Sequence, residues 1–247
     1  MEKLIYAILL NKSETDNLQQ VLSGMAGIDK TALNPISFGQ ISAVYGNFSK
    51  SDFAANQAVA IAFAGVIDEV AKHYTLLPMR FGSFMKTSDD IAKMLEQNHD
   101  GFLQNLEKVE NKFEFGLKVF GDSTKIQEHL KATTPVEEKP LSENEGSKFK
   151  IYVNKKLQAH RLEERLLTFA DTIVAEITQY LKQMEATSKI RKMASEYILV
   201  DGVFLIKKNQ QQQLVDAIGA LQKQYPEIKF VLTGPWPPYN FVEVKLK

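Results

Sequence analysis

The sequence predicts an α+β protein with two domains, each containing an antiparallel sheet built in the order βαββαβ, as in ferredoxin-like folds. Two observations lead to this prediction. Short apolar runs of strand length alternate with helical patterns, in the same order in both halves of the chain. In the second half, Asp201-Gly202 lies between two apolar runs, which is typical of a hairpin turn. We expect an N-terminal domain at 1–110 and a C-terminal domain at 111–247.

The first half is expected to hold one βαββαβ unit followed by a helical segment. Gly39-Gln40 separates two β-rich runs and favours a hairpin, and Pro78 favours an edge or terminal position for the fourth strand. The predicted strands are 3–10, 36–38, 41–45 and 76–81. The predicted helices are 13–25, capped by Ser13; 51–74, capped by Ser51 or Asp52; and 88–109, with Asp89 and Asp90 in its first turn.

The second half is expected to repeat this order with a longer first helix. The predicted elements are a strand at 113–120, an exposed acidic loop at 133–146, a helix at 147–187, strands at 190–200 and 203–207, a helix at 210–225 and a strand at 228–232. Apolar residues recur at three- and four-residue steps along the long helix, which predicts either a core face or an external coiled coil. They are Leu162, Leu166, Phe169, Ile173, Ile177, Tyr180 and Met184.

The chain closes with a proline- and aromatic-rich tail at 232–242. Pro235, Pro237 and Pro238 fix φ and remove backbone donors, so the tail fits neither a helix nor a central strand. We expect Trp236 to pack on the domain, and Tyr239 and the prolines to be partly exposed. The alternative is that the stiff tail docks on a partner.

The composition excludes several classes of function. Lys and Arg number 30, as do Asp and Glu, so the net charge is zero, which argues against a nucleic-acid-binding protein. The absence of cysteine excludes disulfides, thiolate metal sites and cysteine nucleophiles. The apolar run Leu4–Leu10 is too short to span a bilayer. We therefore expect a soluble, cytoplasmic protein without a membrane span.

Motifs for catalysis are absent from the sequence. It contains no phosphate-binding loop, no dinucleotide fingerprint and no nucleophile elbow. Glu69 and His73 share a helix face and are expected to form a surface ion pair rather than half of a metal site. Arg80, between apolar residues, is expected either to be buried against a carboxylate or carbonyl, or to lie in an interface. We expect no catalytic, cofactor-binding or metal-binding residues.

Four segments of the chain resemble the gas vesicle protein F/L family. They are the tail run 232–242, Leu77–Phe84, Lys112–Phe120 and the opening Leu4–Ile8, and they occur in the order of the family. The resemblance therefore covers essentially the whole chain. Phe115 is a departure, because tryptophan is frequent at that place in the family, but the exchange keeps an aromatic side chain.

The resemblance implies a non-enzymatic accessory or minor structural protein of gas vesicles. It implies binding to the small hydrophobic major shell protein, help in nucleation or assembly of the shell, and contact with other gas vesicle accessory proteins. The location it implies is the gas vesicle or the cytoplasm. The residues that we expect to bind partners are Arg80, Phe81, Pro235, Trp236, Pro237, Pro238 and Tyr239.

A different class of function stays open at this point. Ferredoxin-like domains often bind small molecules between sheet and helices, so a small-molecule-binding regulatory protein is the main alternative. A cofactor-free enzyme is a third possibility. Ligand-dependent shifts in melting temperature would favour the regulatory protein. Co-purification with a small, very apolar protein would favour the assembly role.

Overall fold

In the computed structural model, the chain forms two compact units, which are described separately. The structure describes residues 1–11, 18–48, 57–122, 124–126, 148–195 and 197–243. The first unit comprises Met1–Glu114 together with Pro235–Lys247, and the second comprises Phe115–Gly234. This division places the tail with the first unit, whereas the sequence analysis grouped it with the second half. The α+β class with two antiparallel sheets is confirmed.

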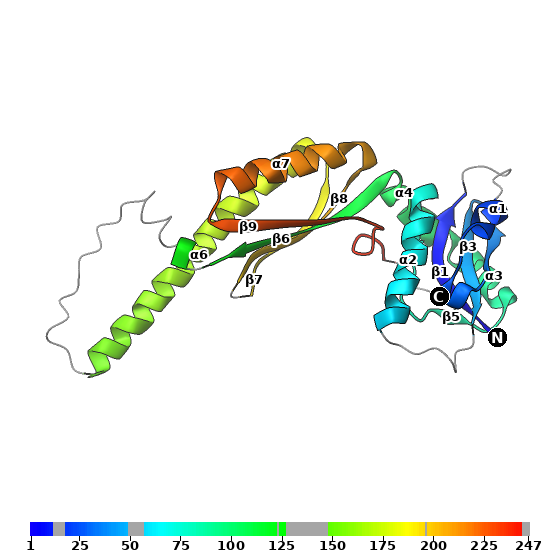
Figure 1. Ribbon diagram of the computed structural model, residues 1–247, viewed down its shortest axis with the longest axis horizontal. Coiled ribbons are helices and arrows are strands. Elements are labelled where there is room, and N and C mark those ends of the chain that lie inside the picture. Colours follow the sequence, from blue (N-terminus) through cyan, green and yellow to red (C-terminus); the bar gives the residue numbers. More distant parts are fainter. Residues whose placement is uncertain (12–17, 49–56, 123, 127–147, 196, 244–247) are drawn as a thin grey trace. The chain divides into compact units, whose positions relative to one another are not determined.

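Figure 1 shows the helices and strands of both units. Those of the first are β1 (Glu2–Leu10), α1 (Leu18–Ser23), η1 (Ile28–Lys30), β2 (Leu33–Phe38), β3 (Ile41–Phe48), α2 (Gln57–His73), β4 (Leu76–Pro78), β5 (Phe84–Met85), α3 (Ser88–Gln97) and α4 (His99–Val109). Those that follow are β6 (Lys112–Gly121), α6 (Lys148–Gln183), β7 (Thr187–Ser195), β8 (Ile198–Lys207), η3 (Lys208–Gln210), α7 (Gln211–Gln224) and β9 (Ile228–Trp236).

The first sheet has the strand order β2-β3-β1-β4, and β5 also pairs with β1. The expected hairpin at Gly39-Gln40 is confirmed, because Phe38 pairs with Ile41 and Gly39 takes a positive φ of 56°. Six consecutive residues of β1, Leu4 to Leu9, are fully buried. Successive strand side chains point to opposite faces, so both faces of β1 are covered.

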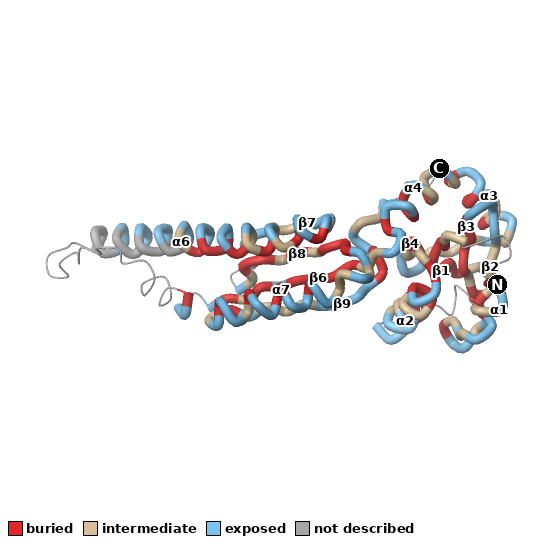
Figure 2. Tube along the Cα trace, turned by 90° about the horizontal axis from the view of Figure 1, so that it is seen from above, coloured by how far each residue is buried: buried red, intermediate tan, exposed pale blue. Residues whose placement is uncertain are grey.

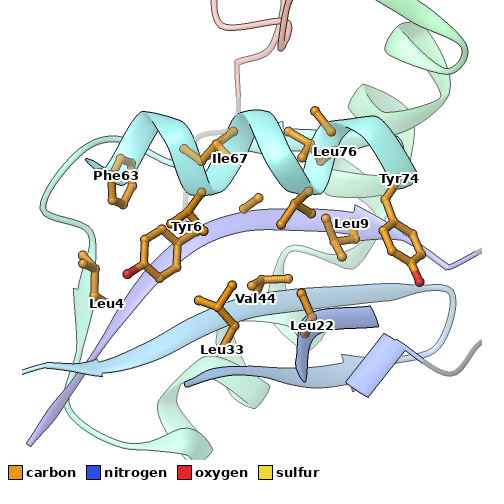
Figure 3. Packing of buried hydrophobic residues seen from close by; sticks show 14 of the residues in the cluster. Leu4, Tyr6, Leu9, Leu22, Leu33, Val44, Phe63, Ile67, Tyr74 and Leu76 are labelled. Carbon is orange, nitrogen blue, oxygen red and sulfur yellow. The ribbon is translucent and has the colours of Figure 1, made fainter. Parts of the chain in front are cut away.

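Tyr6 anchors the core beneath α2 (Figure 3). Its ring stacks on Phe63, with 5.1 Å between the ring centroids, and its hydroxyl accepts a hydrogen bond from the backbone N–H of Ile28 at 3.1 Å. That bond holds the start of η1, in which Asp29 and Lys30 both have positive φ. A buried hydroxyl therefore supports a loop whose backbone is costly for L-residues.

The strands expected at 36–38 and 41–45 are longer, at Leu33–Phe38 and Ile41–Phe48. Two further expectations for the first half were wrong in their boundaries. The helix predicted at 88–109 is two helices, because Asn98 leaves the helical conformation and its side chain donates to the carbonyl of Met94 at 2.8 Å. Thr87 caps α3 through a capping box with Asp90. The strand predicted at 76–81 ends at Pro78. The predicted caps Ser13, Ser51 and Asp52 lie outside the described residues.

The second sheet has the order β7-β8-β6-β9, with β7 and β9 at its edges. The expected hairpin turn at Asp201-Gly202 was wrong, because both residues lie inside β8, where Asp201 pairs with Arg191 across to β7. The Asp201 carboxylate contacts the side chains of Lys118 at 3.1 Å and Arg191 at 2.9 Å, one on each neighbouring strand. The acidic residue thus bridges three strands instead of making a turn.

Gly202 lies in a tightly packed part of β8. A Cβ atom there would lie 3.1 Å from the ring of Phe204, which is fully buried, and 3.4 Å from Ile190. The glycine leaves room for the aromatic ring, as glycines in strand interiors often do at close approaches. Asp201 therefore forms ion pairs and Gly202 packs against the Phe204 ring, although the pair has a high propensity for turns.

Among the described side chains of the long helix α6, the buried ones lie in its C-terminal part. Leu166, Phe169, Ile173, Ile177 and Met184 are buried, so this part of the predicted seam is a core face. The side chain of Leu162 lies outside the described residues. The acidic loop predicted at 133–146 also lies outside them.

Tyr225 lies directly after α7 and connects this helix to α6. Its hydroxyl donates to the Glu176 carboxylate of α6 at 2.6 Å, and burial followed by Glu176 raises the pKa of Tyr225 to about 12. Tyr225→Phe should lower the free energy of unfolding near pH 7 by about 1.5–3 kcal/mol, the usual range for a hydrogen bond to a charged group. Because the folded-state pKa is raised, this stabilisation is complete below pH 10 and is lost as the pH rises through about 12.

Denaturant titrations of both proteins from neutral to alkaline pH check this prediction. The gap in stability between wild type and Tyr225→Phe should narrow across that alkaline range. A gap that stays constant with pH would contradict the assignment of the shift to Tyr225.

Candidate partner-binding surface

The C-terminal tail continues directly from the edge strand β9. The strand was expected to end at Leu232 but runs to Trp236, and Pro235 is tolerated because β9 lies at the sheet edge. After the strand, the N–H of Tyr239 donates to the carbonyl of Pro237 at 2.8 Å, a tight turn. The stiff turn predicted for the whole segment is thus confined to its second half.

Two side chains of the first unit fasten the tail. The Glu114 carboxylate, itself buried, accepts hydrogen bonds from the backbone N–H of Asn240 at 2.7 Å and from its side-chain amide at 2.5 Å. The Asn105 side-chain amide donates a hydrogen bond to the backbone carbonyl of Glu243 at 3.3 Å, and its oxygen accepts one from the backbone N–H of Glu243 at 3.3 Å. The two bonds resemble those made by a neighbouring strand. We call these four bonds the tail clasp. It fixes the backbone of residues 240–243 on the first unit.

The tail clasp gives a second prediction. Asn240→Ala removes one of the amide donors to a buried carboxylate and should lower the free energy of unfolding by about 1–3 kcal/mol. Asn34→Ala is the matched control, because the Asn34 amide makes only a local surface bond to the carbonyl of Ala32. Urea denaturation compares the two variants. Equal stabilities for them would show that the clasp does not hold the tail.

The aromatic side chains of the tail are more exposed than Pro237 and Pro238. Trp236 is 44% exposed, so the expectation that it packs on the domain was wrong, whereas the partial exposure expected for Tyr239 is confirmed at 42%. Pro235 is exposed, but Pro237 and Pro238 are buried, contrary to expectation. The prolines thus anchor the turn and leave the aromatic rings outside. Burial of the hydroxyl, followed by the Asp68 and Glu114 carboxylates, raises the pKa of Tyr239 to about 12.

Arg80 and Phe81 lie in a tight turn between β4 and β5. The backbone N–H of Ser83 donates to the carbonyl of Arg80 at 3.1 Å, and Gly82 has a φ of 85°, as a type II turn requires at its third residue. The Arg80 side chain is exposed and forms no ion pair with any described residue, so its expected burial was wrong. The Arg80 side chain points to solvent, and the backbone carbonyl of Arg80 holds the turn by accepting the hydrogen bond from Ser83. Phe81 stays partly exposed while its ring contacts Phe63 of α2 at 5.4 Å.

Helix α2 is the element that these sites share. Phe81 touches its Phe63, and the Tyr239 hydroxyl lies in the field of its Asp68. Ile61, on the outer side of α2, is 63% exposed. We call Ile61, Phe81 and Tyr239 the α2 rim.

A groove of about 410 Å³ lies between α2 and the loop at residues 24–27. Small and apolar residues dominate its lining, which we call the α2 groove: Gly24, Met25, Ala26, Gly27, Ala62, Gly65, Val66 and Glu69. A Cβ atom on Gly65 would meet nothing within 4 Å, so no packing inside the chain requires a glycine in the middle of this helix. The sequence analysis missed this groove, although a glycine and alanines on one side of α2 were a visible signal.

A candidate metal site is not found in the described part of the chain. No group of three or more His, Asp or Glu side chains in those residues could hold a metal ion. Glu69 pairs with Lys72 at 2.5 Å rather than with His73, and His129 lies outside the described residues. No helix among those residues is both long enough and apolar enough to cross a membrane.

Exposed apolar side chains gathered on one surface are typical of an interaction site. The model of the family described as gas vesicle synthesis protein GvpL/GvpF matches residues 3–243. The chain belongs to this family of gas vesicle proteins. It is 25% identical over 192 residues to gas vesicle protein L of a Streptomyces species, covering 75% of this chain and 69% of that protein. It is 22% identical over 236 residues to gas vesicle protein F1 of Halobacterium salinarum, covering 94% of this chain and 91% of that protein.

Solved structures of gas vesicle proteins share this fold. The chain is similar to the GvpF crystal structure from Anabaena, with a TM-score of 0.76 and 16% identity, covering 99% of this chain and 97% of that one. The GvpF structure from Microcystis aeruginosa gives a TM-score of 0.74 at 18% identity, covering 98% and 99%. At these identities the likeness shows the fold of the chain.

Proposed function

We propose that this chain is a non-enzymatic accessory protein that binds the small hydrophobic gas vesicle shell protein and assists nucleation or assembly of the shell. Membership of the GvpL/GvpF family over residues 3–243 carries the link to gas vesicles. The exposed apolar residues around α2 support a binding role. A shell subunit that lines a gas-filled space exposes apolar surface before assembly, and a partner that covers this surface prevents aggregation.

The α2 groove and the α2 rim are the surfaces that we assign to the shell protein. Gly65 and Ala62 allow the backbone of a partner to come close, and Ile61 offers a bulky contact beside them. Of the residues expected from the sequence, Phe81 and Tyr239 belong to the rim. Arg80, Pro235 and Trp236 are exposed and stay proposed contacts, and Pro237 and Pro238 would act by positioning Tyr239.

Three finer features belong to the same proposal. The strand order β7-β8-β6-β9 supports a ferredoxin-like assignment of the second unit, and the order β2-β3-β1-β4 supports the same for the first. Other gas vesicle accessory proteins are further partners, and nucleic acid is not. The chain would act in the cytoplasm and at the gas vesicle, by binding equilibrium alone.

A deletion strain tests the proposed function. Loss of the gene should reduce the number of gas vesicles, and the wild-type gene should restore them. Trp236→Ala and Tyr239→Ala, introduced separately, should restore them less well while leaving the melting temperature of the purified proteins nearly unchanged. Normal vesicles in the deletion strain, together with no co-purification of shell protein, would refute the proposal.

A further inference from the structure

Helix α6 is longer than the sheet that it covers (Figures 1 and 2). Its 36 residues span about 54 Å at a rise of 1.5 Å per residue. The 10-residue strand β6 spans about 33 Å at roughly 3.3 Å per residue. The helix is therefore about 20 Å longer than this strand, by the same two rises per residue. We call residues 148–165 the α6 overhang.

The burial pattern along α6 agrees with these lengths. The first buried side chain in the described part of the helix is Leu166, and those described from Tyr152 to Glu164 are exposed. Bulky apolar residues are among them, with Tyr152 57% exposed, Leu157 45% exposed and Val153 similarly open. The overhang thus presents large apolar side chains that no described element covers.

The overhang lacks the tertiary packing that stabilises most helices. Helices in proteins gain most of their stability from packing an apolar face rather than from the propensity of their residues. Two local contacts lie within the overhang. The Lys156 ammonium lies over the Tyr152 ring at 5.5 Å, and His160 forms an ion pair with Glu164 at 3.5 Å. A bound partner would supply the missing apolar contacts.

The charge of the overhang indicates the chemistry of that partner. The sequence of residues 148–165 carries four Lys, two Arg and two Glu, which gives a net charge of +4, in a chain whose total net charge is zero. Two overhangs from different copies would repel each other. An acidic segment with an apolar stripe complements both the charge and the exposed Val153 and Leu157.

We infer that the α6 overhang is a docking site for an acidic amphipathic helix of another protein. The inference deepens the proposed function, because it assigns a second partner to a surface separate from the α2 groove. The overhang would provide the second contact through apolar burial, with Lys156 and Arg161 selecting an acidic partner.

Peptide binding to the full-length protein tests the inference. The probe is a labelled 21-residue helical peptide with leucines at three- and four-residue steps and glutamate at the other positions. Its control has lysine in place of glutamate. Fluorescence anisotropy should show at least about tenfold tighter binding of the acidic peptide, and raising the salt from about 0.05 to 0.5 M should weaken it.

Variants of overhang residues test whether the acidic peptide binds at the α6 overhang. Leu157→Asp and the double variant Lys156→Glu/Arg161→Glu should each weaken binding of the acidic peptide by about tenfold or more. Val215→Asp, an equally exposed apolar site on α7, is the matched control and should bind like wild type. The double variant keeps good helix formers, so circular dichroism should show unchanged helix content.

Three results would overturn the inference. They are equal binding of the two peptides, wild-type binding by both overhang variants, and binding of the chain to anionic lipid vesicles in place of the acidic peptide. Gly65→Leu, in the α2 groove, should leave binding of the acidic peptide unchanged. A failure of this inference is therefore distinguishable from a failure of shell-protein binding.

Discussion

Replacing Phe204 with alanine is expected to lower the free energy of unfolding by about 3–5 kcal/mol, the range for large-to-small changes at buried aromatic positions. Phe204 is fully buried on β8, and its ring fills the space that Gly202 leaves open. The alanine would leave a cavity in place of the Phe204 ring. Gly202, which lies beside that ring, has no side chain that could move in to fill the cavity. Urea denaturation followed by circular dichroism measures the loss.

Val215→Ala serves as the control for this prediction. Val215 is an exposed apolar residue on α7, so its truncation should change stability by less than about 0.5 kcal/mol. A loss below about 1 kcal/mol for Phe204→Ala would contradict the packing of Gly202 and Phe204 inside β8. It would bring back the hairpin-turn interpretation of Asp201-Gly202.

Filling the α2 groove has the largest effect expected on binding. Gly65→Leu should weaken binding of the shell protein by about 30-fold or more, which corresponds to roughly 2 kcal/mol, the threshold for an interface hot spot. The same change should not destabilise the chain, because a Cβ at Gly65 meets nothing within 4 Å. Replacing a glycine within an exposed helix should instead stabilise it by about 0.5–1 kcal/mol.

Gly219→Leu on α7 is the control for the groove. Gly219 is also within a helix, and a Cβ there likewise meets nothing within 4 Å. Both variants should therefore gain similar stability, and only Gly65→Leu should lose affinity. Equal affinities of the two variants for the shell protein would remove the α2 groove from the binding surface.

The sequence predicted strands and helices well where hydrophobic periodicity decided them. Strand β1 and helix α7 match their predicted bounds closely, because an apolar run and a helical stripe followed by Pro226 mark them clearly. The prediction failed where tertiary contacts outweigh local propensity. Asp201-Gly202 favours a turn locally, but ion pairs to Lys118 and Arg191 and the Phe204 ring hold it in a strand.

The candidate site was harder to predict than the fold. Sequence reasoning selected Phe81 and the tail aromatics by residue type, and these side chains are exposed on the first unit. It could not foresee the α2 groove, because the groove pairs Ala62 and Gly65 with a loop some 40 residues earlier in the chain. Nor could it foresee the clasp between Glu114 and Asn240, because their separation of 126 residues leaves no local pattern.

Direct titration of purified chain with the shell protein tests the central claim most closely. The shell protein would be kept soluble in detergent at a fixed concentration, and binding followed by microscale thermophoresis for wild type, Gly65→Leu and Gly219→Leu. Saturable binding by wild type and Gly219→Leu, weakened for Gly65→Leu, is the predicted result. No binding by the wild-type chain, at concentrations where it remains folded, would contradict a role in covering the shell protein.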